Sequence, residues 1–100
     1  MNLVEQAALA KAINDLHGCN AKLKEIVIVK ETFRDSVVWE GAVHVFDVDH
    51  PNTKVCYAWS SPVEGSDRRR FYTVLKIPPV NSPQDAVRAA IVSDHKGDRT

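Results

Sequence analysis

The sequence lacks the features that mark most specialised classes of protein. It holds two cysteines among its 100 residues, and its 13 basic residues balance 13 acidic ones. No apolar run approaches the roughly 20 residues that span a membrane. Two cysteines form one disulfide at most, which excludes a small secreted domain held together by several disulfides. A net charge of zero supplies no long-range field that would collect nucleic acid or an anionic membrane.

What the sequence does contain is the composition of an ordinary globular domain. Hydrophobic residues make up 44% of the chain and charged residues 26%, which argues against disorder. Residues Met1 to Gln6 are acidic and helical in character, unlike a basic secretory leader. We therefore expect one domain over residues 1–100 in the cytoplasm, with reduced thiols and no membrane association.

One amphipathic helix is expected at each end of the chain, each with a recognisable start. Apolar residues recur at helical spacing over residues 3–17 and again after residue 82. The signals are the Asn2–Glu5 capping box and the terminating Gly18 for the first helix, and Ser82 before Pro83 for the second.

Between the helices, runs of alternating apolar and polar residues predict strands at 25–33, 37–48, 54–60 and 69–77. Whether 25–33 is a separate strand or the extension of one hairpin stays open. Because the connections are short, we expect an antiparallel meander of three to four strands. The predicted fold class is α+β, with both helices on one face of the sheet. Gly41, inside a strand, indicates a bulge or a large side chain over bare backbone.

With both helices on one face, the other sheet face would leave apolar side chains in water. Exposed apolar surface costs roughly 25 cal/mol per Å², and a contiguous patch usually marks an interaction site. We therefore predict a non-enzymatic binding module that self-associates, as a dimer, or binds another protein. Its predicted interface residues are Val38, Phe46, Tyr72 and Val74.

Nucleic-acid binding is the first alternative, because Arg68, Arg69 and Arg70 precede Phe71 and Tyr72. Basic residues beside aromatic ones can hold phosphates and stack on bases. The element order resembles that of double-stranded RNA-binding domains, whose last helix begins with a lysine-rich cluster. This chain has the neutral to acidic Ser82-Pro83-Gln84-Asp85 there. The interpretation of the arginines as a solvated hairpin end is therefore favoured.

A small metal-dependent or cysteine-dependent enzyme is the further alternative. His44, Asp47, Asp49 and His50 are residue types that bind metals, and Cys56 could act as a nucleophile with a histidine base. Their spacing matches no known ligand set, and neither an oxyanion site nor an orienting group is recognisable around Cys56. Ordinary turn residues and a small buried cysteine are the favoured interpretation, so we predict no catalytic residue, metal or cofactor.

The aromatic residues on the predicted strands allow two interpretations. If Trp39 and Trp59 share a sheet face, they could line a ligand pocket between the sheet and a helix. A chain of this size rarely forms a large pocket, so a role in the core or in an interface is favoured.

Several stretches carry a resemblance: Trp39-Glu40-Gly41, Val45-Phe46-Asp47, His50-Pro51, Cys56 to Ser60, Pro78-Pro79-Val80, and Ala86 to Ile91. In these stretches the chain resembles small uncharacterised bacterial proteins, some of which are carried as mobile gene cassettes of integrons. The resemblance covers about residues 30–92. It implies a bacterial cytoplasmic α+β protein, often oligomeric, and it transfers no catalytic residue.

Overall fold

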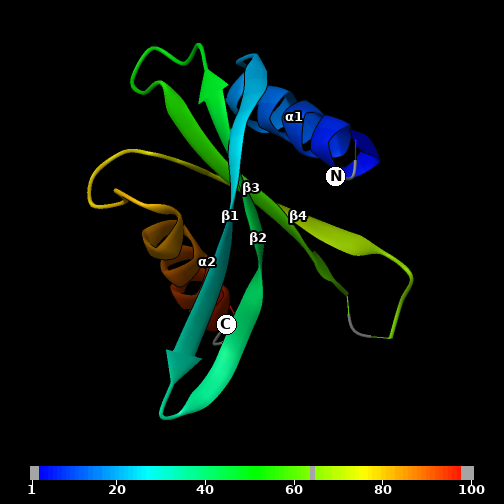
Figure 1. Cartoon of the computed structure of the whole chain (residues 1–100), viewed down its shortest axis with the longest axis vertical. Helices are drawn as coiled ribbons and strands as arrows, with labels where there is room; N and C mark the ends of the chain where they lie inside the picture. Colours follow the sequence, from blue (N-terminus) through cyan, green and yellow to red (C-terminus); the bar gives the residue numbers. More distant parts are fainter. Residues whose placement is uncertain (1–2, 64, 98–100) are drawn as a thin grey trace.

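The computed structural model describes residues 3–63 and 65–97, and it confirms the α+β fold class. An N-terminal helix is followed by four strands and a C-terminal helix (Figure 1). The elements are α1 (Leu3–His17), β1 (Ala21–Phe33), β2 (Ser36–Val48), β3 (Val55–Pro62), β4 (Arg69–Leu75) and α2 (Pro83–Gly97).

The four strands form one antiparallel meander in the order β1-β2-β3-β4. β1 is thus a separate strand, and it begins at Ala21. The β1–β2 connection is a short hairpin, in agreement with the short connections between the predicted strands. Arg34 and Asp35 both have positive φ, 51° and 66°, as the central residues of a type I′ turn do.

The helix ends follow their sequence signals. The Gly18 amide donates to the carbonyl of Asn14 at 2.9 Å, and Gly18 has a φ of 69°, a left-handed conformation that glycine adopts without steric cost. At the start of α2, the Asp85 amide donates to Ser82 Oγ at 3.1 Å, so Ser82 is the predicted cap. The predicted cap Asn2 lies outside the described residues.

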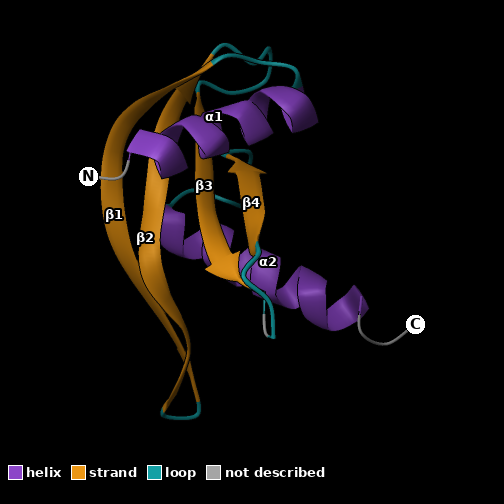
Figure 2. Ribbon diagram, turned by 90° about the vertical axis from the view of Figure 1, so that its right-hand side faces the viewer, coloured by secondary structure: helices purple, strands orange, loops and turns teal. Residues whose placement is uncertain are grey.

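The prediction that both helices cover one sheet face is wrong, because they lie on opposite faces. Figure 2 shows α1 in front of the strands and α2 behind them. α1 packs on Phe46, Cys56 and Ala58, whereas α2 packs on the alternate residues of the same strands, including Val45 and Trp59. The apolar second face, which suggested an exposed patch, is covered by a helix of the same chain.

The sheet therefore separates two apolar clusters. The cluster under α1 has Leu9, Ile13 and Phe46 fully buried at its centre. The cluster under α2 is built around Trp59 and Val87. Each helix buries its apolar stripe against one side of the same four strands, a three-layer arrangement.

One part of the sheet extends beyond both clusters. β2 pairs with β3 from His44 to Asp47 in the described chain, so residues 27–43 of the β1–β2 hairpin continue beyond β3 as a two-stranded extension. We call this extension, together with Ile26 at its base, the arm. It is the long hairpin that descends to the bottom of Figures 1 and 2.

Candidate functional site

The arm carries most of the large apolar side chains that the sheet leaves exposed. Ile28 is 70% exposed and Phe33 63% exposed, and Ile26, Val37 and Val38 are exposed as well. Ile26 and Ile28 pair with His44 and Ala42 on β2, which places them on the α1 side of the sheet. Both lie at the sheet edge, where they remain exposed.

Near its tip the arm forms a groove with α2. The groove has a volume of about 500 Å³ and is lined by apolar side chains, chiefly Phe33, Val38, Ile91 and Val92, with Arg88 and Glu31 beside them. Val38 reaches this groove because it is the extra residue of a β-bulge: Glu31 pairs with Trp39, and Thr32 pairs with Val37.

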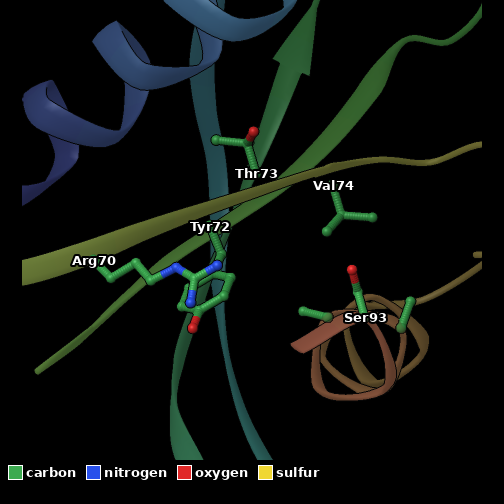
Figure 3. A pocket seen from close by; sticks show the side chains of 7 residues that line it. Arg70, Tyr72, Thr73, Val74 and Ser93 are labelled. Carbon is green, nitrogen blue, oxygen red and sulfur yellow. The ribbon is translucent and has the colours of Figure 1, made fainter. Parts of the chain in front are cut away.

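The four predicted interface residues do not share a surface. Phe46 is fully buried under α1, so its assignment to an exposed interface is wrong. Tyr72 and Val74 lie on the opposite face, half-buried beside α2, where Figure 3 shows Val74 near Ser93. Val38 is the one predicted residue on the arm, and the bulge, which the sequence did not reveal, turns it toward α2.

Trp39 and Trp59 do fall on one sheet face, and they take part in a row of ring contacts, of which the one between Trp59 and Tyr72 is stacked. The Arg70 guanidinium lies 4.8 Å from the ring centre of Tyr72, and that ring stacks on Trp59 at 5.3 Å with an interplanar angle of 8°. Trp59 lies 6.0 Å from Trp39. A hollow of about 200 Å³ remains beside them under α2. Most of this aromatic surface is packed against α2, in agreement with a role in the core.

The three arginines diverge instead of forming one basic patch. Arg69 lies on the α1 side, where its guanidinium donates to Ser60 Oγ at 2.8 Å. Arg70 lies on the α2 side over Tyr72 (Figure 3). Arg68 precedes the strand, with its amide bonded to Ser66 Oγ. An arrangement split between two faces does not favour a continuous nucleic-acid surface.

A buried polar cluster lies under the first turn of α1. Ser60 Oγ donates to Glu5 Oε1 at 2.7 Å and accepts from Arg69. His44 is 4% exposed, and burial lowers its pKa while Glu5 opposes that shift. Within the described chain, His44 Nδ1 has no hydrogen-bond partner. Although Ser60 and His44 are on one face, no hydrogen bond joins them in the described structure, so they lack the contact of a catalytic Ser–His pair.

Cys56 shares the α1 face with His44, as the sequence allowed, but its environment opposes nucleophilic chemistry. Its side chain is fully buried, and burial, with a contribution from Cys19, raises the pKa of the thiol to about 12. A thiol held in its neutral form is a poor nucleophile. The favoured interpretation of Cys56 as a small buried hydrophobe agrees with this geometry.

The acidic and histidine residues of the β2–β3 turn have structural partners. Asp49 accepts from the Asn20 amide at 2.7 Å, a bond that lowers the pKa of its carboxyl group and ties the turn to the start of β1. His50 Nδ1 accepts from the Asn52 amide at 3.0 Å. Asp47 is exposed on β2. Among residues 3–63 and 65–97, no three His, Cys, Asp or Glu side chains are grouped as metal ligands.

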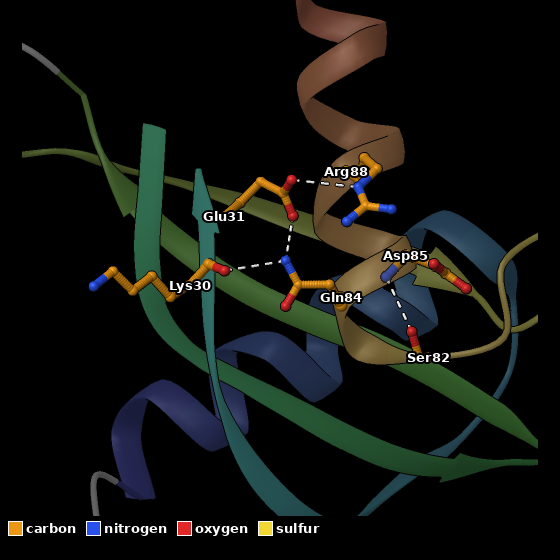
Figure 4. A network of polar contacts seen from close by, with 6 residues as sticks. All are labelled: Lys30, Glu31, Ser82, Gln84, Asp85 and Arg88. Atoms are coloured by element: carbon orange, nitrogen blue, oxygen red, sulfur yellow. Dashed lines mark hydrogen bonds and ion pairs between the residues drawn. The ribbon is translucent and has the colours of Figure 1, made fainter. Parts of the chain in front are cut away.

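A polar clamp fastens α2 to the outer edge of β1 (Figure 4). The Gln84 side-chain amide donates to the Lys30 carbonyl at 3.1 Å and to the Glu31 carboxylate. The Arg88 guanidinium donates to the other oxygen of Glu31 at 3.3 Å. The clamp covers the β1 edge at the middle of the arm.

Sequence reasoning missed Ile26, Ile28 and Phe33 as exposed apolar residues. Four consecutive apolar β-branched residues, Ile26 to Val29, are typical of a strand buried on one or both faces. Val29 is buried under α2, whereas Ile28, its neighbour with the opposite orientation, is exposed. The signal that could have separated them was their alternation along the strand.

No protein-family model, curated protein or solved structure matches this chain significantly. The resemblance to integron-cassette proteins, the bacterial origin and the cytoplasmic location therefore stay predictions. Within the described part of the chain, neither helix has the length and apolar character needed to cross a bilayer.

Proposed function

We propose that this protein is a non-enzymatic interaction module that acts as a homo-oligomer, most simply a dimer, and that its copies meet through the arm. The observation that carries this proposal is the set of large apolar side chains that the arm exposes on both sides. They are Ile26, Ile28, Phe33, Val37 and Val38.

Physical chemistry supports a partner for the arm. A two-stranded hairpin is marginally stable in water when it lacks further strands or a packed helix. α2 covers one side of the arm at Val29 and Trp39, while Ile28 on the other side stays in water. Burying such side chains yields roughly 25 cal/mol per Å² of apolar area. This gain is available to the arm on contact with an apolar surface.

A second copy of the chain is the partner that the charge distribution fits best. With 13 basic and 13 acidic residues, two copies approach each other without net repulsion. The arm itself alternates in sign, with Lys30 paired to Glu40 across the hairpin and Arg34 next to Asp35 at the turn. Because the arm carries both signs of charge, no field of a single sign opposes the approach of a second arm.

Sedimentation equilibrium of the full chain over a range of concentrations tests this proposal. We expect a concentration-dependent mass that approaches that of a dimer at about 100 µM or below. A double arm variant, Ile28→Lys with Phe33→Lys, should shift the mass toward that of the monomer. Leu16→Lys is the matched control, because Leu16 is exposed to a similar degree, 65%, but lies on α1. A wild-type monomer throughout this range would contradict the proposal.

A further inference from the structure

The outer edge of β1 has a free segment with defined limits. Among the described residues, β1 pairs with β2 alone, so its other edge lacks a neighbouring strand. At one end, Lys24 is the extra residue of a β-bulge between Leu23 and Glu25. At the other end, the side-chain amide of Gln84 donates a hydrogen bond to the Lys30 carbonyl, which is therefore not free to pair with another strand (Figure 4). The uncovered stretch is residues 25–29, with Val27 at its centre.

The clamp also reveals which backbone groups face outward. Because Gln84 on α2 reaches the Lys30 carbonyl, that carbonyl points away from β2. In an antiparallel strand, the N–H and C=O of one residue point to the same side, and the side alternates along the chain. The register runs without interruption from Glu25 to Glu31. Ile26 and Ile28 therefore also direct their amide and carbonyl groups outward.

From this geometry we propose that two copies of the chain pair through their β1 edges, antiparallel about a two-fold axis at Val27, to form one continuous eight-stranded sheet. This inference rests on the proposed function and specifies the contact. Ile26 of each copy lies opposite Ile28 of the other, and each such pair exchanges two backbone hydrogen bonds. This pairing gives the outward amide and carbonyl groups of Ile26 and Ile28 hydrogen-bond partners.

The side chains support the same register. Ile26 and Ile28 are both exposed and project from the sheet face that α2 does not cover. In the paired edges they form a cluster of four isoleucines, and cross-strand pairs of β-branched residues stabilise a sheet. On the α2 side, Val27 of one copy meets Val27 of the other. One charged residue, Glu25, occurs within the free segment.

The residues that flank the segment limit the pairing to it. Natural sheets protect exposed edges with bulges and lysines. In β1 the bulge and the lysines lie at Lys24 and Lys30, outside the segment. In the proposed register, Lys24 of one copy lies opposite Lys30 of the other. The other edge strand, β4, has seven residues against thirteen for β1, and it begins with Arg69 and Arg70.

Charge substitutions at Ile26 and Ile28 test both the contact and its register. Ile28→Lys alone and Ile26→Glu alone each place a charge against an isoleucine and close to the same charge of the other copy. Each should weaken the dimer by at least about tenfold in Kd. The double variant Ile26→Glu/Ile28→Lys sets the introduced carboxylate of one copy opposite the introduced ammonium of the other. It should recover most of the wild-type affinity.

The readout is the dissociation constant from sedimentation equilibrium, with circular dichroism to verify that each variant is folded. Ile28 is 70% exposed in the single chain, so its replacement should leave the fold intact. Phe33→Lys, at the arm tip and outside the free segment, is the control and should retain the wild-type constant.

Two outcomes separate this inference from the proposed function. If the dimer persists in Ile28→Lys but is lost in Phe33→Lys, the copies meet at the arm tip and edge pairing is wrong, although self-association stands. If the wild-type chain is monomeric up to about 100 µM, the proposed function fails as well. Failure of the double variant to recover affinity would overturn the register centred on Val27.

Discussion

The indole ring of Trp39 lies directly over the backbone of Gly41, two residues further along β2. A Cβ atom built on Gly41 would come within 2.9 Å of Trp39 Cζ2. The ring is held there by a hydrogen bond from its Nε1 to Ser61 Oγ, at 2.9 Å, and by its contact with Trp59. The sequence predicted a bulge or a large side chain over this glycine, and the second of these is confirmed.

Gly41→Ala should destabilise the protein by about 1–3 kcal/mol, because the added methyl group forces the Trp39 ring out of its packed position. Chemical denaturation followed by circular dichroism measures the change. In a Trp39→Leu background the same substitution should cost much less, since the ring that it displaces is absent. Equal costs in both backgrounds would show that the contact with Trp39 is not the cause.

The folded protein should lose stability as the pH falls below about 6.5. Burial lowers the pKa of His44, and burial together with His50 lowers the pKa of His17. The unfolded chain then binds more protons than the folded one in this range. The stabilisation is complete above pH 6.5 and is lost as the pH drops through the lower folded-state values.

The measurement is the free energy of unfolding at a series of pH values between 5 and 8. His44→Phe should reduce the slope below pH 6.5, whatever its effect on the stability at pH 8, because the titrating group is removed. An unchanged slope in this variant would rule out His44 as a source of the acid sensitivity.

Gln84→Ala should loosen the attachment of α2 to β1 and destabilise the fold by about 1–2 kcal/mol, because it leaves the Lys30 carbonyl and the Glu31 carboxylate without this donor. Arg88→Ala is the matched comparison. It should cost less than about 1 kcal/mol, since its ion pair with Glu31 is exposed on the arginine side. A larger effect of the Arg88 substitution would contradict the assigned roles.

Both cysteines should react slowly with thiol reagents in the native protein. Cys19 and Cys56 are free and buried, and burial raises the pKa of each thiol, to about 12 for Cys56. Labelling at pH 8 should be slower than in the denatured chain by a factor of about 100 or more, since it depends on opening of the structure. Native labelling as fast as that of the denatured chain would disprove the buried environment.

The sequence predicted the elements well where local chemistry determines them. The first helix covers the expected residues 3–17, because Gly18 ends it. Pro83 begins α2 after its Ser82 cap, also as expected. β1 starts at Ala21, four residues before the predicted residue 25, although the alternation of Ala21 and Leu23 with Lys22 and Lys24 is itself a strand pattern.

The placement of the helices could not be predicted in the same way. Alternate residues of β2 and β3, such as Phe46 and Val45, are equally apolar, so the pattern does not distinguish one covered face from two. The bulges at Lys24 and Val38 reverse the orientation of the residues beyond them and have no recognisable local signal. For these reasons, Val38 alone of the predicted interface lies on the candidate surface.

The side chains of β3 pack alternately on the two sides of the sheet, and this limits how the strand can open locally. Cys56 and Ala58 pack under α1, while Tyr57 and Trp59 pack under α2, and β3 is hydrogen-bonded to strands on both of its edges. Its amide protons become accessible to solvent only when the strand separates from a neighbour. In deuterium exchange, the amides of residues 56–58 should therefore be the slowest of the chain and should report global unfolding.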